Sequence, residues 1–452
     1  MVKVFLIILL LLQLLFLLSL QFTAWPEMLS YPYLRNNGFL IYKDMIHPYP
    51  PILTMGLSWI YSIFGYHLWV MQAVSWGINL SSSIMVFFIT RLLTKKGLIA
   101  LLTLFFYVIL QPFLDGNMLW FDNVIVLPIL LGLYFTLRKN FLFTGLFLSI
   151  AMLTKQTAGL FLVVLILHTM LRKTPWKNLK YFFIGPLILG VPLLARLLQE
   201  GALVDFLNWT IVYPLTLFKN FPGYVHTELS ATQILISIFL LAPLLFLTFK
   251  PPKLLEEKNF QILLGFLVVS IVIIYPRFSF FHAQTALAVL VICYGYLLKN
   301  WKLKNLILTF IPTTLIIFIF LLWSVLATDW GKNARFYRSD DIKLAEAIKK
   351  KADGKLTFLF GLHSGLYAMA DIVPPKRWTD NFGWYLEIPG VQDEILVRWD
   401  DKPPDMVLWR TPTEGNWFDL GTYQPQKIVK WIERNYNKKE ELEPGIWLWV
   451  KN

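Results

Sequence analysis

Long apolar segments follow one another through the first three quarters of the chain, and most are long enough to cross a bilayer as helices. The segment near 141–154 is the shortest of them. The first segment follows Lys3 and lacks a small-residue cleavage site after it, so we interpret it as a retained span and not as a signal peptide. Eleven spans are predicted, near residues 4–22, 67–90, 97–113, 119–136, 141–154, 157–171, 179–198, 231–249, 259–275, 280–298 and 305–327.

The pattern changes after Trp330, where short apolar runs alternate with polar ones. Such alternation is typical of a small α/β domain, here expected to have a mostly parallel sheet. We therefore expect a transmembrane domain over 1–327 and an α/β domain over 328–452. The predicted helices cover 340–351, 363–370, 392–399 and 424–435, and the predicted strands cover 356–360, 406–409 and 446–450.

Composition supports a membrane protein, because 57% of the residues are hydrophobic and only 15% are charged. The net charge is +13, yet the first 326 residues hold 22 basic and 9 acidic residues while the last 126 hold 19 of each. Since the excess of basic residues lies in the hydrophobic part, no nucleic acid is expected as a partner. The lone Cys293 excludes a disulfide within the chain.

The basic residues also predict the orientation in the membrane. If the N-terminus is cytoplasmic, sixteen basic residues of the membrane part lie near span ends on the cytoplasmic side and six on the other side. Lys and Arg near span ends resist translocation, so this orientation is favoured. An odd number of spans then places 328–452 outside the cytoplasm. The sequence predicts a multi-pass plasma-membrane protein with an extracytoplasmic C-terminal domain.

Acidic residues gather on the predicted outer side, with seven of the nine in the membrane part. The outer loop 23–66 is rich in aromatic residues and prolines, which favours short interfacial helices. Glu27 lies where the first span emerges. A carboxyl group half out of water there can have a raised pKa and act as a general base. An N-cap or loop-solvating role is equally open on spacing alone.

Three basic residues sit where spans end on the outer side: Lys155, Arg277 and His282. Lys155 has almost no loop around it to supply water. A cation at that depth calls for an anionic partner, and a lipid-linked phosphate meets this need, although snorkelling to the headgroups is the alternative. The six histidines show no metal-ligand spacing, so no cofactor is expected.

In the order and membrane placement of several short segments, the chain resembles the GT-C superfamily of glycosyltransferases that use polyprenyl-phosphate sugars. The likeness is to the branch with protein O-mannosyltransferases, the lipid A aminoarabinose transferase and the bacterial family 39 enzymes, and it covers the full chain. It rests on Glu27-Met28-Leu29-Ser30-Tyr31, Gly38, Tyr42-Lys43-Asp44, Pro50-Pro51, Asp122, Leu153-Thr154-Lys155-Gln156-Thr157, the stretch from Arg277 to His282, Tyr367 and Pro374-Pro375.

The resemblance implies that a carboxylate of the first outer loop activates an acceptor, which displaces the polyprenyl phosphate with inversion. Glu27 matches the catalytic acid, with Met28 where the superfamily usually has a second acid. Asp44 matches another acidic position of the loop and is a rival base. Asp122 matches a further recurring acid, suited to holding the loop of Glu27 or the acceptor.

The resemblance also implies that Lys155, Arg277 and His282 bind the donor phosphate. Some superfamily members use a divalent ion, so a metal stays open. The resulting prediction is a hexosyl- or pentosyltransferase of the cell envelope that transfers a sugar to a glycan, lipid or protein acceptor on the outer face. A lipid-linked sugar transporter or flippase would bind the same anionic lipid, and a membrane scaffold would act through 328–452. Acids on one outer loop favour the enzyme over either alternative.

Overall fold

The computed structural model of the chain describes residues 1–171, 176–221, 223–245, 255–299, 311–380, 383–410 and 425–452. Contacts within the chain divide it into two compact units. Unit 1 comprises Met1–Phe22, Gln72–Leu193 and Val225–Lys332, and unit 2 comprises Thr23–Met71, Leu194–Tyr224 and Asn333–Asn452. The predicted domain division at residue 327 stays a prediction.

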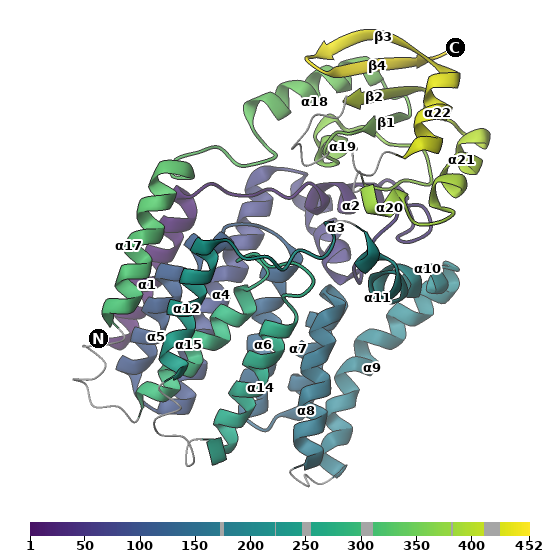
Figure 1. Ribbon diagram of the computed structural model, residues 1–452. Helices are drawn as coiled ribbons and strands as arrows, with labels where there is room; N and C mark the ends of the chain where they lie inside the picture. Colours follow the sequence, from purple (N-terminus) through teal and green to yellow (C-terminus); the bar gives the residue numbers. More distant parts are fainter. Residues whose placement is uncertain (172–175, 222, 246–254, 300–310, 381–382, 411–424) are drawn as a thin grey trace. The chain divides into compact units, whose positions relative to one another are not determined.

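Unit 1 is built from helices, and a helix occupies each of the eleven predicted apolar segments (Figure 1). Residues 246–249 and 305–310 of those segments lie outside the described residues. Three of the described helices are long and apolar enough to cross a membrane by length and composition, over Val2–Ser19, Leu68–Thr94 and Lys180–Gln199. Eleven crossings therefore stay a prediction. The helices are α1 (Val2–Ser19), α4 (Leu68–Thr94), α5 (Gly97–Leu110), α6 (Phe121–Leu137), α7 (Phe141–Thr154), α8 (Gly159–Leu171), α9 (Trp176–Gln199), α12 (Ala231–Leu245), α14 (Lys258–Val272), α15 (Gln284–Leu298) and α17 (Ile311–Thr328).

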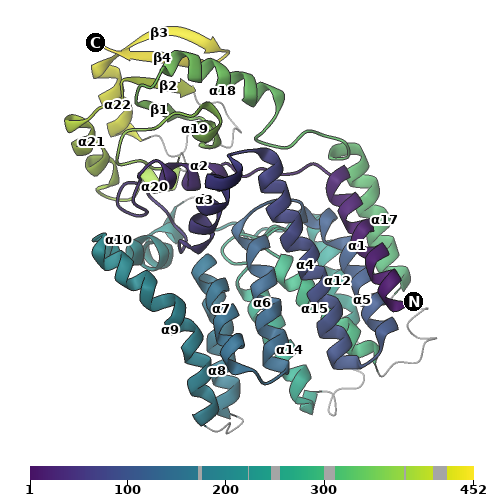
Figure 2. The same ribbon diagram turned by 180° about the vertical axis from the view of Figure 1, so that it is seen from behind.

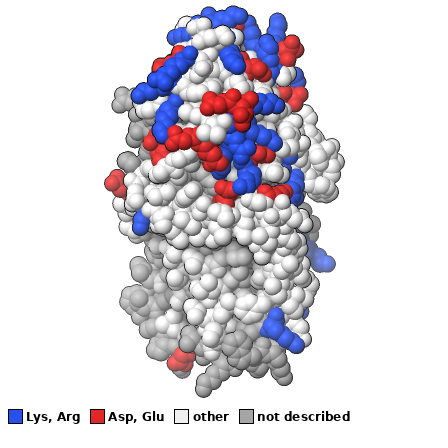
Figure 3. All heavy atoms as spheres, turned by 90° about the vertical axis from the view of Figure 1, so that its right-hand side faces the viewer, with Lys and Arg blue, Asp and Glu red and all other residues white. Residues whose placement is uncertain are grey.

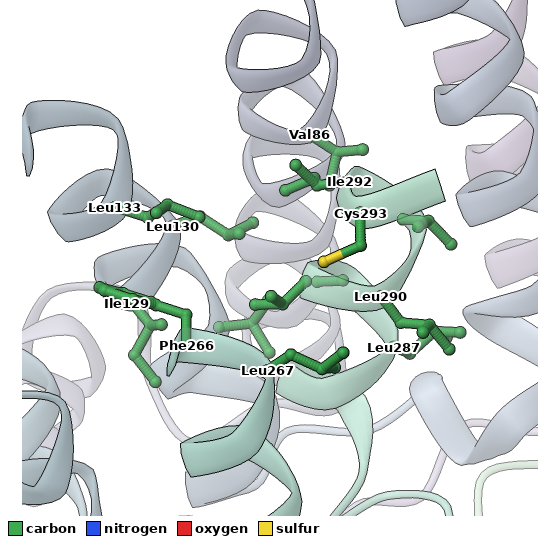
Figure 4. Packing of buried hydrophobic residues seen from close by; sticks show 14 of the residues in the cluster. Val86, Ile129, Leu130, Leu133, Phe266, Leu267, Leu287, Leu290, Ile292 and Cys293 are labelled. Atoms are coloured by element: carbon green, nitrogen blue, oxygen red, sulfur yellow. The ribbon is translucent and has the colours of Figure 1, made fainter. Parts of the chain in front are cut away.

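Helix α15 forms the centre of this bundle, because every side chain from Gln284 to Leu298 is buried. A helix that is apolar on all its faces is stable only when neighbours surround it. Figure 4 shows Leu290 and Cys293 of α15 packed among side chains of α6 and α14, including Leu130 and Phe266. The lone cysteine is therefore a core residue.

The first and last helices of the bundle, α1 and α17, lie side by side in both ribbon views (Figure 2). Leu20 and Trp330 form a β-bridge, and the N–H of Gln21 donates to the carbonyl of Asp329 at 2.9 Å. The chain thus leaves unit 1 at the same end of the bundle after α1 and after α17. An odd number of crossings requires this arrangement, while the side that faces the cytoplasm stays a prediction.

The segment η1 (Pro112–Gly116) interrupts the helical path between α5 and α6. Buried polar side chains take up its backbone groups: Gln111 and Asn79 each donate to the carbonyl of Gly116 at 3.0 Å. Backbone groups left unpaired inside an apolar bundle are costly. These bonds fix the start of α6, where Asp122 lies.

Unit 2 contains a four-stranded sheet with the order β1-β2-β4-β3, formed by β1 (Thr357–Phe360), β2 (Met406–Arg410), β3 (Tyr436–Glu443) and β4 (Ile446–Lys451). Only β1 and β2 pair in parallel, while β4 is antiparallel to both β2 and β3. The predicted mostly parallel sheet is therefore wrong. The cause is β3, whose Lys and Glu side chains conceal a strand from the hydrophobic pattern; a charged edge strand is a common way to prevent edge-to-edge association.

The helices predicted for the tail are confirmed, apart from residue 424, which lies outside the described residues. They are α18 (Ser339–Ala352), α19 (Gly365–Ala370), α21 (Val391–Asp401) and α22 (Gln426–Asn435). The structure adds the short helix α20 (Gly383–Leu386). Two tryptophans join helices to sheet: the ring of Trp399 lies 4.7 Å from that of Phe358 and 5.2 Å from that of Trp431.

The first loop also belongs to unit 2 and contains two helices, α2 (Glu27–Asn36) and α3 (Ile52–Phe64). Loop and tail are joined by backbone hydrogen bonds, since Ile46 donates to the carbonyl of Trp378 at 2.9 Å and Trp378 donates to that of Asp44 at 2.8 Å. The predicted helices of the loop are confirmed, and their place at a membrane interface stays a prediction. The segment Leu194–Tyr224 adds α10 (Leu203–Leu207) and α11 (Tyr213–Thr216).

Charge is divided between the units more sharply than along the sequence. Unit 1 holds 19 Lys and Arg against 6 Asp and Glu, whereas unit 2 holds 22 of each. On the face drawn in Figure 3, acidic and basic side chains intermingle over the α/β part and are sparse over the helical bundle. The whole net charge of +13 therefore resides in unit 1.

Candidate functional site

Two buried carboxyl groups of unit 2 are close enough for the charge of one to act on the other: Glu27 from the first loop and Asp380 from the tail. Glu27 is 3% exposed and Asp380 is 1% exposed. Asp380 Oδ2 accepts the hydroxyl of Ser364 at 2.8 Å, and Ser364 Oγ accepts the hydroxyl of Ser30 at 3.0 Å. Glu27, Ser30, Ser364 and Asp380 form the acid cluster.

Local sequence explains how Glu27 is presented. It is the first residue of α2, directly after Pro26, and the free N–H groups of a first turn favour a carboxylate. Helix α19 packs against this turn, since a Cβ atom placed on Gly365 would lie in ordinary contact with the Cα atom of Pro26, at 3.4 Å. Glu27 Oε2 is buried and has no hydrogen-bond partner among the described residues.

Burial raises the pKa of Glu27 well above its usual range, and the negative charge of Asp380 raises it further. A hydrogen bond to the backbone acts in the opposite direction and is the smallest of the three causes. A carboxyl group whose pKa is moved toward neutrality is suited to proton transfer at physiological pH.

Aromatic side chains surround the acid cluster. Tyr31 lies one turn after Glu27 on α2, and Tyr385 lies on α20. Both are buried, and burial raises the pKa of each well above its usual range, with added contributions from the charges of Glu27 and Asp380. Both hydroxyls therefore stay protonated and are available as hydrogen-bond donors.

His47 fixes the loop between α2 and α3. Its Nδ1 atom lies 2.6 Å from the carbonyl oxygen of Tyr49, and its Nε2 atom lies 2.8 Å from the hydroxyl of Thr54. Burial lowers the pKa of His47 to about 4, so the ring is neutral at pH 7 and Nδ1–H is the donor to the carbonyl. The ring centroid of Tyr31 lies 4.7 Å from that of His47, which holds α2 against this loop.

Asp44, the rival base, has one carboxylate oxygen engaged twice. Oδ2 accepts the backbone N–H of Leu40 at 3.0 Å and pairs with Lys376 Nζ at 2.8 Å. Its backbone carbonyl accepts from Trp378, as described above. These contacts tie the first loop to the tail.

A second group of predicted residues meets in unit 1, where Asp122, Lys155, Arg277 and His282 form the ion-pair cluster. Lys155 Nζ lies 2.5 Å from Asp122 Oδ1, and His282 Nδ1 lies 2.9 Å from Asp122 Oδ2. Arg277 is close enough for its charge to act on His282. Asp122 is 1% exposed and Lys155 8% exposed, so the pair is buried.

The ends of three helices deliver these side chains. Asp122 lies in the first turn of α6, Lys155 directly follows the last residue of α7, and His282 precedes α15. The anionic partner that the depth of Lys155 required is Asp122 in this structure. Thr157 and Ser279, two residues after Lys155 and Arg277, have buried hydroxyl oxygens without a hydrogen-bond partner in the described chain.

Sequence reasoning named every member of the ion-pair cluster but only Glu27 of the acid cluster. Asp380 and Ser364 were missed, because each lies in the tail more than 330 residues from Glu27 and no spacing rule connects them. Their only signal was an acid beside Trp378 in a segment punctuated by prolines. Among the described residues, no group of three His, Cys, Asp or Glu side chains is arranged to hold a metal ion. The expectation of no cofactor stays a prediction.

No family model matches the chain, and no curated protein sequence matches it. Solved structures do. ArnT from Cupriavidus metallidurans bound to undecaprenyl phosphate is similar with a TM-score of 0.65 at 12% sequence identity, over 99% of this chain and 97% of that one. Its apo form is similar with a TM-score of 0.58 at 12% identity over the same shares. The chain has the GT-C fold.

A third similar structure, the apo oligosaccharyltransferase of Archaeoglobus fulgidus, has the same fold with a TM-score of 0.57 at 11% identity. This match covers 90% of the present chain and 69% of the oligosaccharyltransferase. The predicted GT-C resemblance is confirmed at the level of the fold. Identities this low say nothing about individual side chains.

Proposed function

We propose that this protein is a membrane glycosyltransferase that moves a sugar from a polyprenyl-phosphate donor to an acceptor hydroxyl on the outer face of the membrane, with inversion. The observation that supports it best is the buried carboxyl group of Glu27, with one oxygen unpartnered among the described residues, in a chain with the GT-C fold. The presence of undecaprenyl phosphate in the similar ArnT structure supports a lipid of that class as the donor carrier.

The proposed reaction is a single displacement at the anomeric carbon. Glu27 takes the proton of the acceptor hydroxyl, the acceptor oxygen forms a bond to the anomeric carbon, and the bond between that carbon and the phosphate oxygen breaks. The leaving group departs as polyprenyl phosphate with one additional negative charge. No strong general acid is needed, because this leaving group is stable as an anion.

The ion-pair cluster is proposed to bind the donor phosphate. Arg277 and Lys155 supply positive charge where the leaving group gains negative charge, and preorganised charges of this kind stabilise such transition states. The hydroxyls of Thr157 and Ser279, which lack partners in the described chain, add donors of the kind a phosphate oxygen accepts. His282 completes the set.

Asp122 has a different proposed role from Glu27. Its two oxygens already bind Lys155 and His282. It therefore orients these two side chains and neutralises part of their positive charge while no donor is bound. A carboxylate with both oxygens engaged in this way is a poor proton acceptor, which leaves Glu27 as the base.

Two measurements on the full chain in detergent test the proposal. Undecaprenyl phosphate should raise the unfolding temperature of the wild-type protein, and Lys155→Met or Arg277→Met should weaken that effect, whereas Lys438→Met on the edge strand β3 should leave it unchanged. A panel of polyprenyl-phosphate sugars should then identify a donor whose consumption depends on Glu27. Binding without transfer of any sugar, unaffected by Glu27→Gln, would contradict the proposal and favour a transporter.

A further inference from the structure

Asp380 is the one acidic neighbour that acts on Glu27 through its charge among the described residues. A chain of hydrogen bonds between the first loop and the tail holds Asp380 near Glu27. Ser30 lies three residues after Glu27 on α2, a spacing that puts both side chains on one side of the helix. Ser30 bonds to Ser364, and Ser364 bonds to Asp380.

The hydrogen bonds have a direction. The Ser364 hydroxyl donates to Asp380 Oδ2, and the Ser30 hydroxyl donates to Ser364 Oγ. A carboxylate that accepts a hydrogen bond is stabilised in its ionised form. Glu27 Oε2, in contrast, is buried without a partner among the described residues. When the two groups compete for one proton, Asp380 is the one favoured as the anion and Glu27 the one favoured as the acid.

Among the described residues, the two tyrosines that respond to the charge of Glu27 are neutral near pH 7. Tyr31 on α2 and Tyr385 on α20 both respond to the charge of Glu27, and both keep their protons near neutral pH. His363, next to Ser364, turns its Nε2 atom to Asp341 Oδ1 at 3.1 Å. Asp380 is therefore the charge that dominates the surroundings of Glu27.

We propose that Asp380 is a positioning residue for the base: Ser364 holds its buried carboxylate against the turn of α2 that carries Glu27, so that the two carboxyl groups take up the acceptor's proton as a pair. This inference rests on the proposed role of Glu27. In the working cycle the fully ionised pair receives one proton from the acceptor hydroxyl and returns it to solvent after the product leaves.

The coupling of the two groups is tested without any activity assay. Infrared pH titration of the full chain in detergent should show a protonated carboxyl band that persists well above the ordinary carboxyl range and is absent in Glu27→Gln. Asp380→Asn removes the charge but keeps an acceptor for Ser364, so the band should disappear at a pH lower by about one unit or more. Asp380→Ser serves as a second neutral variant should the first not fold.

Asp371→Asn is the matched control, since Asp371 also accepts a hydrogen bond from α2, from Tyr33 at 3.0 Å, yet its side chain is 66% exposed. In this variant the Glu27 band should titrate as in the wild type. A neutral Asp380 variant whose band titrates with the wild type would overturn the inference.

The transfer assay separates this inference from the proposed function. With the donor identified by the panel, the rise of the rate with pH should move to lower pH in Asp380→Asn by the same amount as the band. Full transfer by Glu27→Gln would overturn the proposed base, whatever the infrared titration shows. Loss of transfer in Glu27→Gln with an unmoved profile in Asp380→Asn would overturn only the role of Asp380.

Discussion

Two buried acids, Asp122 in unit 1 and Glu27 in unit 2, begin from the same local position and end in opposite states. Each lies in the first turn of a helix and is at most 3% exposed. Asp122 has a lysine and a histidine on its two oxygens. Glu27 has an oxygen without a partner among the described residues, and a second acid as its neighbour. The folded protein engages both oxygens of Asp122 and leaves one oxygen of Glu27 without a partner among the described residues.

In the proposed reaction, this difference separates an acid that orients donor-binding side chains from the acid that serves as the base. A buried charge is costly unless it is paired and hydrogen-bonded, so a buried carboxyl group without a counter-charge has a raised pKa, as Glu27 does. Replacing Asp122 should therefore harm the fold, while replacing Glu27 should harm the reaction and spare the fold. Four experiments exploit that contrast.

The largest effect is expected from Glu27→Gln. Loss of a general base lowers transfer by about 100-fold or more, because base catalysis contributes roughly two to four orders of magnitude. The shape of the side chain is kept, so the unfolding temperature at neutral pH should not fall. Transfer assays and thermal unfolding in detergent on the same preparation check both parts. If Glu27→Gln were both inactive and strongly destabilised, Glu27 would support the fold as Asp122 does, and the expected difference between the two acids would be wrong.

Replacing a member of the ion-pair cluster should first of all lower the free energy of unfolding. Lys155→Met leaves Asp122 with one of its two partners, and breaking a buried pair by removing one member costs about 3–5 kcal/mol. Asp122→Asn should be destabilising for the same reason. The double variant should lose less than the sum of the two, because neither charge of the pair then remains without the other. Denaturant unfolding of the four proteins measures the cycle, and additive losses would mean that the pair is not coupled.

Local patterns explain why the members of the ion-pair cluster, though not their pairing with one another, could be predicted from the sequence. A lysine between two apolar segments and an acid heading a third must find partners at a helix end, since nothing else there supplies polarity. Apolar runs likewise predicted the helices of unit 1 and the buried strands β1, β2 and β4. Strand β3 was not predicted, because its pattern is charged on both faces. Without β3 in the prediction, β4 was expected to be parallel to its neighbours, whereas it is antiparallel to both β2 and β3.

Of the acid cluster, the sequence predicted Glu27 but not its partners from the tail. The first loop shows Glu27, but its neighbours arrive through tertiary contacts: β1 ends at Phe360, the chain turns, and Ser364 meets α2. Nor did the sequence separate Glu27 from Asp44, which have similar aromatic surroundings. Their difference lies in Lys376 and the backbone N–H of Leu40, which bind Asp44 and not Glu27.

A smaller effect concerns pH. Because the pKa of Glu27 is raised in the folded protein, its contribution to stability is fully present below its ordinary value of 4.5 and is lost as pH rises through the folded-state pKa. Above that pKa the loss is about 1.4 kcal/mol for every pH unit by which the folded-state pKa exceeds the unfolded-state pKa. His47 acts in the opposite direction, because its pKa is lowered to about 4 in the folded protein. Stability is therefore lost as pH falls from 6.5 to about 4, and this loss is the same in the wild type and in Glu27→Gln.

The difference between wild type and Glu27→Gln therefore isolates the carboxyl group. As pH rises above 4.5, the unfolding temperature of the wild type should fall relative to that of Glu27→Gln at the same pH. Parallel curves would show that Glu27 titrates in its ordinary range, and Glu27 would then be no different from a solvated loop acid.

The smallest effect is expected from Asp44→Asn, and it sharpens the comparison most directly, because Asp44 shares the loop with Glu27. Its pair with Lys376 is partly exposed, with 45% of the lysine side chain accessible, and such pairs contribute about 1 kcal/mol or less. The asparagine still accepts the N–H of Leu40. Stability should fall within that limit and transfer should stay within about threefold of the wild type, since no proton is taken up by this carboxylate in the proposed reaction. Lys376→Met serves as the matched control, because it removes the same pair from the other side. A loss of transfer in Asp44→Asn as large as in Glu27→Gln, without a similar loss in Lys376→Met, would make Asp44 the base and return Glu27 to a supporting role.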